Sequence, residues 1–248
     1  MLGELLPFDN RLELLAGRTL FRKTRLQVHR VAGWEMLVDH SACDAGSIRS
    51  LLAGNMYKSL LQSIYMVQMN VMDLGANAGG FPLLLHSLGA KFKRLLAVEM
   101  NPNTFKRLKF NLEYNEPNAT VINAAAVGAA RTLRLALGNG STMDSIYRGG
   151  RRPQREYEIQ GRTVDDMASM FGDEVIDIAK IDIEGAESEL FLDCTTFDTL
   201  SRINHLIIEI HDEKLAPHIH SKIRESGFKL CSGVNRSGCG VHLFSRVV

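Results

Sequence analysis

The stretch Asn70-Val-Met-Asp-Leu-Gly-Ala-Asn-Ala-Gly-Gly-Phe81 decides the fold of this 248-residue chain. It opens with an apolar run, which is typical of a strand that is buried on both faces. Gly75 then permits a tight turn, and Gly79 and Gly80 allow a ligand or a helix to approach the backbone closely. Because the first N–H groups of a helix have no partner within the helix, this turn predicts a site for a polar or anionic ligand group.

The turn Gly75-Ala-Asn-Ala-Gly-Gly80 differs from the dinucleotide fingerprint G-x-G-x-x-G, because Asn77 stands where a pyrophosphate needs glycine. Asp73, just before the turn, would repel a pyrophosphate but would suit an ammonium group. Glu99 closes the second apolar strand, Leu95–Glu99, where a carboxylate can accept both hydroxyls of a ribose. A nucleoside that carries an amino acid has both of these groups. The pattern therefore predicts S-adenosylmethionine (SAM) as the cofactor.

Three segments carry a resemblance to a known family: Val71-Met-Asp-Leu-Gly-Ala-Asn-Ala-Gly-Gly-Phe81, Ala97-Val-Glu-Met-Asn-Pro-Asn103 and Lys180-Ile-Asp-Ile-Glu-Gly-Ala-Glu187. Together they resemble the FkbM-type SAM-dependent methyltransferases, over roughly residues 50–211. The first two segments are typical of any class I methyltransferase, and the third is more specific. The resemblance implies methylation of a hydroxyl, often on a sugar or another small molecule. In this family a Tyr-Glu pair often precedes the glycine turn, and Tyr57-Lys58 is the nearest match here.

The remaining cofactor contacts are predicted from two further segments. Small side chains at Ala125 and Ala126 leave room for a flat adenine ring, although simple packing of a helix on a strand explains them nearly as well. Asn101 precedes the predicted helix Pro102–Tyr114, whose cations, including Arg107, are expected to face solvent. The predicted cofactor residues are Asp73, Gly75, Asn77, Gly79, Glu99, Asn101, Ala125 and Ala126.

Polar side chains at the ends of later strands mark the predicted acceptor side. Asp182 and Glu184 end the predicted strand Val175–Ile183, and His211 follows His205–Ile210. Ligands in open α/β sheets bind beyond the carboxyl ends of the strands, so we predict that these three residues are catalytic. The base is expected to be His211 or Asp182, although a histidine that is only hydrogen-bonded at a strand end is an equal alternative. Asp182 and Glu184 could hold a metal, but no complete ligand set is visible in the sequence, and no metal is predicted.

The alternation of strands and helices predicts an α/β fold for residues 70–248, namely a Rossmann-like class I methyltransferase domain. We expect a mainly parallel seven-stranded sheet that ends in an antiparallel hairpin. Residues 1–69 lack this alternation and predict an N-terminal hairpin (20–31 and 34–39) with a helical segment, Ser47–Val67. This N-terminal part is expected to cap the open end of the sheet.

Composition narrows the classes of function. A net charge of +1 provides no overall field for nucleic acid or a membrane surface. No apolar run approaches a membrane-spanning length, and the N-terminus lacks the pattern of a signal peptide. The four cysteines show no metal-binding spacing. These features predict a cytoplasmic protein with reduced thiols.

Three alternatives to a small-molecule methyltransferase stay open. One is an NAD-dependent oxidoreductase on a similar sheet, against which the G-A-N-A-G-G turn argues. Another is an RNA ribose methyltransferase that uses the arginine-rich segment 138–155, whose arginines equally well face solvent. The third is a SAM-fold protein without catalysis that serves as a partner module. The chain lacks the Asn/Asp-Pro-Pro-Tyr/Phe and Pro-Cys motifs after the fourth strand, which disfavours methylation of nucleic-acid bases.

Overall fold

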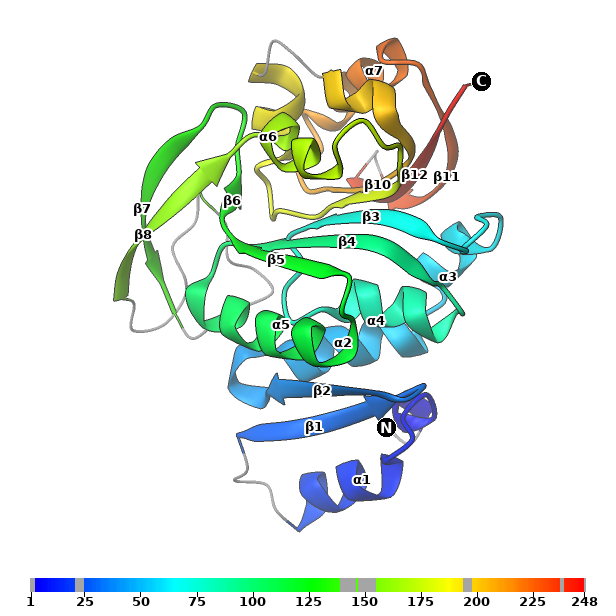
Figure 1. Cartoon of the computed structure of the whole chain (residues 1–248), viewed down its shortest axis with the longest axis vertical. Coiled ribbons are helices and arrows are strands. Elements are labelled where there is room, and N and C mark those ends of the chain that lie inside the picture. Colours follow the sequence, from blue (N-terminus) through cyan, green and yellow to red (C-terminus); the bar gives the residue numbers. More distant parts are fainter. Residues whose placement is uncertain are drawn as a thin grey trace.

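A seven-stranded mixed sheet forms the centre of the computed structural model, which describes residues 3–20, 25–138, 146, 155–193, 198–236 and 239–247 (Figure 1). Its strand order is β11-β12-β10-β9-β3-β4-β5, and β12 runs antiparallel to both of its neighbours. This order confirms the predicted Rossmann-like class I methyltransferase fold. The strands are β3 (Met69–Leu74), β4 (Phe92–Glu99), β5 (Ala119–Asn123), β9 (Ile176–Ile181), β10 (Ile203–Ile210), β11 (Phe228–Arg236) and β12 (Cys239–Arg246).

Helices cover both faces of this sheet (Figure 1). On one face lie α2 (Asp44–Ala53), α4 (Gly80–Ser87) and α5 (Pro102–Asn115), and on the other lie α6 (Val164–Ala168) and α7 (Ala216–Glu225). Alternate residues of β3 enter different apolar clusters: Val71 packs with the α4 side and Met72 with the α6 side. All six residues of β3 are buried, which explains its continuous apolar pattern.

Local signals in the sequence place several helix ends. Asn101 caps α5 by accepting hydrogen bonds from the backbone N–H groups of Asn103 and Thr104, and Thr163 forms the capping box of α6. Other boundaries differ from the prediction. The expected helical segment 47–67 is divided at Gly54 into α2 and α3 (Met56–Leu61). The chain after β9 forms a π-helical turn, η4 (Glu189–Asp193).

A second, three-stranded sheet stands beside the main one, in the order β6-β8-β7 (Figure 1). It comprises β6 (Ala125–Ala126), β7 (Arg131–Leu137) and β8 (Arg155–Arg162). β8 pairs antiparallel with β7 and parallel with β6. Most of the arginine-rich segment 138–155 lies outside the described residues.

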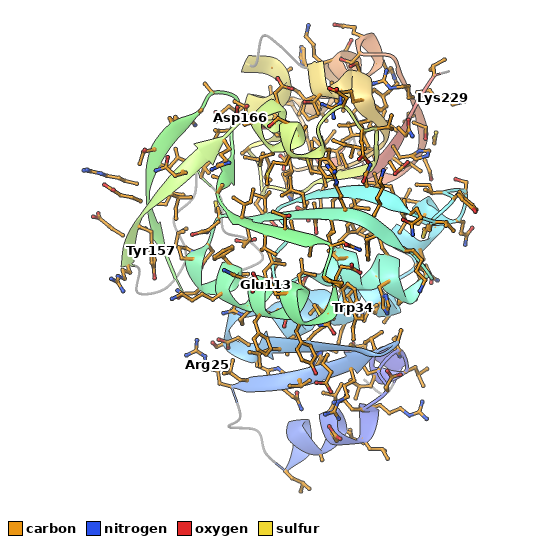
Figure 2. All side chains as sticks on the ribbon, viewed as in Figure 1. Arg25, Trp34, Glu113, Tyr157, Asp166 and Lys229 are labelled. Atoms are coloured by element: carbon orange, nitrogen blue, oxygen red, sulfur yellow. The ribbon has the colours of Figure 1, made fainter. Side chains whose placement is uncertain are left out.

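The N-terminal hairpin, β1 (Leu26–Val31) and β2 (Trp34–Asp39), forms an outer layer on α5 and not a strand pair of the main sheet (Figure 1). It is preceded by α1 (Arg11–Thr19). Trp34, labelled in Figure 2, stacks on His86 of α4 with ring centroids 4.5 Å apart. The short helices are η1 (Gly3–Leu5), η2 (His40–Ala42), η3 (Ser169–Phe171) and η5 (Asp198–Arg202). The apolar core is continuous from the hairpin into the main sheet, and the boundary between 1–69 and 70–248 stays a prediction.

Side-chain amides replace neighbouring strands along both edges of this hairpin. On the β2 edge, Asn111 of α5 accepts from the N–H of Leu37 and donates to its carbonyl, and Asn115 does the same for Glu35. On the β1 edge, Asn10 accepts from the N–H of Arg30 and donates to the carbonyl of Val28. Buried backbone groups need such partners, so these amides hold the hairpin in its place.

Candidate functional site

A cavity of about 450 Å³ lies at the carboxyl ends of β3, β4, β9 and β10. Seven of the eleven predicted site residues line it, and α2 and α3 supply part of its wall. Asp73, Gly79, Asn101 and His211 are not among the described residues of the wall. The seven predicted residues that line the cavity are Gly75, Asn77, Glu99, Ala125, Ala126, Asp182 and Glu184.

The glycine turn is shaped by two different contacts. Gly75 has a φ of +79°, and a Cβ atom there would lie 1.8 Å from the carbonyl oxygen of Asp182, so only glycine allows the two segments to meet. Gly79 has a φ of +95°, and its Cβ would face Met36 and Leu108 at 3.2 and 3.4 Å. The absence of a side chain at Gly79 therefore serves the packing of β2 and α5 on the turn.

Glu99 connects the turn with the start of α5. Its Oε2 accepts from the N–H of Asn77 at 3.0 Å, and its Oε1 accepts from the N–H of Asn101 at 2.8 Å. The side chain is 8% exposed and lies in the cavity wall. Asn101 is fully buried, and its backbone N–H helps to fix the position of the Glu99 carboxylate.

Asp73 does not line the cavity, and the ammonium group that it contacts is that of Lys180. The Nζ of Lys180 lies 3.3 Å from Oδ1 of Asp73 and 3.3 Å from Oδ2 of Asp182. Burial lowers the pKa of Lys180, but the two carboxylates outweigh this effect and raise the pKa above its ordinary value. Lys180 lines the cavity and therefore presents a fixed positive charge there.

The three predicted catalytic residues come together. Each of Asp182, Glu184 and His211 offers an atom within 4.8 Å of the other two. The Nε2 of His211 lies 3.5 Å from Oε2 of Glu184 and 3.8 Å from Oε1 of Glu209, and its Nδ1 lies 3.1 Å from Oε1 of Glu187. Glu184 lies in a turn and has a positive φ of +55°.

Charge and burial shift two pKa values within this group. Burial lowers the pKa of His211, but its hydrogen bond to Glu187 and the surrounding carboxylates raise it to about 9. Burial and the neighbouring carboxylates Asp182 and Glu209 raise the pKa of Glu184 to about 7, against the opposing effect of His211. At neutral pH and without bound ligands, His211 is therefore protonated on both ring nitrogens and positively charged.

Two residues that are not among the eleven predicted site residues complete this side of the cavity. Glu187 is 1% exposed, and its Oε1 also accepts from the N–H groups of Ile183 and Gly185. Its position three residues after Glu184, at the end of the family motif, is the signal that could have marked it. Tyr57 lines the cavity with its ring 5.9 Å from that of Phe81.

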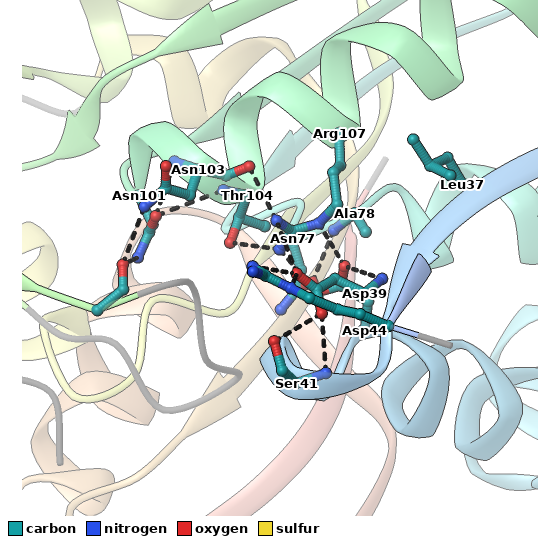
Figure 3. A network of polar contacts seen from close by, with 12 residues as sticks. Leu37, Asp39, Ser41, Asp44, Asn77, Ala78, Asn101, Asn103, Thr104 and Arg107 are labelled. Carbon is teal, nitrogen blue, oxygen red and sulfur yellow. Dashed lines mark hydrogen bonds and ion pairs between the residues drawn. The ribbon is translucent and has the colours of Figure 1, made fainter. Parts of the chain in front are cut away.

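One expectation for α5 is wrong. Arg107, expected to face solvent, is buried and forms two bonds with Asp44 of α2, at 2.5 and 3.1 Å (Figure 3). It also donates to the hydroxyl of Thr104 and to the carbonyl of Asn103. The network attaches the N-terminal wall of the cavity to the helix that Asn101 caps.

The fold and the arrangement of this cavity define a protein of the class I methyltransferase type. The chain belongs to the methyltransferase FkbM domain family, whose family model matches residues 73–230. This confirms the resemblance seen in the three sequence motifs. No curated protein matches the sequence significantly. Among the described residues, no helix has the length and apolar character needed to cross a membrane.

Solved structures with a similar arrangement are distant in sequence. Trm5b from Pyrococcus abyssi is 15% identical with a TM-score of 0.49, and the match covers 90% of this chain and 56% of that one. A methyltransferase from Pyrococcus furiosus is 12% identical with a TM-score of 0.48, covering 97% and 100%. Methyltransferase FkbM from Methylobacillus flagellatus KT is 15% identical with a TM-score of 0.46, covering 96% and 60%. This chain thus spans little more than half of the length of the first and third proteins.

Proposed function

We propose that this protein is a SAM-dependent methyltransferase that acts on a hydroxyl of a small molecule or sugar. The observation that carries this proposal is one cavity that holds the glycine turn, Glu99, the Ala125–Ala126 strand and the Asp182–Glu184 turn together. Family membership supports the same activity.

The cofactor fits this cavity with its methionine part at the glycine turn. The backbone of Gly75 and Asn77 borders that end, and the ammonium of Lys180, held by Asp73 from below, can meet the cofactor carboxylate. Glu99 is proposed to accept the ribose hydroxyls, since a carboxylate has about four lone-pair positions.

Of the other predicted cofactor residues, two lie in the cavity wall and two would act through their neighbours. Ala125 and Ala126 lie in the wall and would leave space for the adenine ring. Asn101 and Gly79 would act indirectly: Asn101 fixes the carboxylate of Glu99, and Gly79 lets the turn pack on its neighbours.

Methyl transfer places the acceptor oxygen opposite the sulfonium sulfur. A carbon–oxygen bond forms while the carbon–sulfur bond breaks, and its electron pair stays on the sulfur of the demethylated product. Proximity and alignment supply much of the rate. We propose that Asp182, Glu184 and His211 surround the acceptor hydroxyl and that one of the two carboxylates takes up its proton, because His211 is already protonated at neutral pH.

Isothermal titration calorimetry with SAM and its demethylated product tests the proposal. We expect Glu99→Gln to weaken binding about tenfold to hundredfold, because hydrogen bonds to a charged group contribute about 1.5–3 kcal/mol. The amide keeps one oxygen for the backbone N–H groups that Glu99 holds. Glu113→Gln, on the exposed face of α5, is the matched control. Binding of NAD without binding of SAM, or full affinity in Glu99→Gln, would contradict the proposal.

A further inference from the structure

We propose that Asp182, Glu184 and His211 form a binding site for one divalent transition-metal cation at the acceptor end of the cavity. Their three ligand atoms lie within 4.8 Å of one another. Three donors that bind one ion at about 2.1 Å lie about 3.0–3.6 Å from one another. Nε2 of His211 and Oε2 of Glu184 already have this spacing, at 3.5 Å, and a donor pair at the 4.8 Å limit has to approach by about 1.2–1.8 Å.

The surroundings of His211 orient its ring for such a role. Its Nδ1 is bonded to Glu187, which the N–H groups of Ile183 and Gly185 hold in turn. The opposite nitrogen, Nε2, faces Oε2 of Glu184 at 3.5 Å. A histidine that binds a metal usually donates its other ring N–H to a carboxylate, which fixes the ring and its tautomer. Glu187 is then the orienting carboxylate, and Nε2 becomes the ligand atom when it releases its proton to solvent as the cation binds.

A second observation, outside this group, indicates that a bound molecule completes the site. Tyr57 is 4% exposed and lines the same cavity as Asp182 and Glu184. Within the described ranges of the chain, its hydroxyl has no hydrogen-bond partner. The hydroxyl oxygen is not one of the buried polar atoms that lack a partner, so it is accessible from the cavity, where an oxygen of a bound molecule can accept from it. An acceptor oxygen on the cation would be in position to do so.

The donor set and its charge indicate the kind of cation. Asp182, Glu184, Glu187 and Glu209 surround the imidazole of His211, and Lys180 is shared between Asp73 and Asp182. This excess of carboxylates favours a dication. One nitrogen and two oxygen donors suit Mn²⁺, Fe²⁺ or Zn²⁺ better than Mg²⁺ or Ca²⁺, which prefer oxygen alone.

The role of the cation in catalysis rests on the proposed function, whereas its binding does not. A hydroxyl bound to a dication loses its proton more readily, because the cation stabilises the oxygen anion. The cation would therefore both position the acceptor oxygen for attack on the methyl carbon and prepare it for the reaction.

The test is a titration of the metal-free, full-length protein with Mn²⁺, followed by the electron paramagnetic resonance signal of the free ion. We expect a single class of site. His211→Ala and Glu184→Gln should each weaken it roughly tenfold or more, and Glu187→Gln about 10- to 100-fold. Glu113→Gln, an exposed carboxylate on α5, should leave the affinity unchanged. Absence of Mn²⁺ uptake, or an equal loss in Glu113→Gln, would overturn the site.

Two further measurements keep the outcomes separate. Thermal unfolding of each variant shows whether it folds. If His211→Ala does not fold, the Mn²⁺ affinity of Glu184→Gln decides, because this substitution replaces only one carboxylate oxygen with an amide nitrogen. Calorimetry with SAM on the same metal-free protein distinguishes the two proposals. SAM binding without Mn²⁺ uptake overturns the cation site alone, and Mn²⁺ uptake without SAM binding overturns the proposed function alone.

Discussion

Replacing Arg107 by methionine should destabilise the whole protein, because it leaves the carboxylate of Asp44 buried without its cation. Asp44 is fully buried, the side chain of Arg107 is 9% exposed, and two hydrogen bonds of 2.5 and 3.1 Å join them. Removing one partner of a buried ion pair costs about 3–5 kcal/mol, compared with about 0–1 kcal/mol for an exposed pair. For a domain of this size, each kcal/mol lowers Tm by about 2–4 °C, which gives a decrease of about 6–20 °C.

Urea denaturation of Arg107→Met and of the double variant Asp44→Asn, Arg107→Met measures this effect. The double variant should recover part of the loss, because no uncompensated charge remains. Lys106→Met, on the exposed side of the same helix, should change the free energy of unfolding by less than about 0.5 kcal/mol. A loss below about 1 kcal/mol in Arg107→Met would refute the interpretation of this pair as a buried link.

Three further substitutions test other contacts. Gly75→Ala should abolish soluble folding because its Cβ would meet the carbonyl of Asp182, whereas Gly89→Ala, at a similar positive φ in open space, should cost only about 1–2 kcal/mol by thermal unfolding. Asn111→Leu and Asn115→Leu should both lower stability, but only Asn111→Leu should also weaken SAM binding in calorimetry, since Asn111 alone donates to Ala78 of the turn. Burial and His242 lower the pKa of His220, so the folded state binds fewer protons than the unfolded state, and stability should fall as the pH decreases below about 6.5. His220→Gln should reduce that pH dependence, and an unchanged urea midpoint profile would contradict it.

The fold was open to prediction because its signals are local. The apolar run of β3 and the N-cap at Asn101 each depend on a few adjacent residues, and both occur as predicted. The division of the predicted helical segment 47–67 at Gly54 has a local cause as well. It could not be predicted from the apolar spacing, because that spacing does not show where the chain has to turn. A Cβ at Gly54 would lie 2.5 Å from the carbonyl of Ser50.

The parts of the site that escaped prediction depend on partners far away in the sequence. Arg107 looks like a solvent-facing cation until Asp44, 63 residues earlier, is brought beside it. The sequence assigns Asp73 to the ammonium group of the cofactor, but it could not show that Lys180, from the third motif, lies 3.3 Å from this carboxylate. A periodic pattern assigns charged residues to solvent, and it cannot reveal that two of them neutralise each other in the interior.

The side chain of Asn111 belongs to three segments at once. Its amide group satisfies the backbone of Leu37 in the hairpin and the carbonyl of Ala78 in the glycine turn, while its own backbone is part of α5. We therefore expect the outer layer and the glycine turn to unfold together as one cooperative unit. A shortened chain that starts at residue 70 would leave both Asn111 and its neighbour Asn115 without their strand partner, and it should expose the apolar side of α5 to water. The first 69 residues are in this sense an internal part of the domain, although they lie outside its repeating strand–helix pattern.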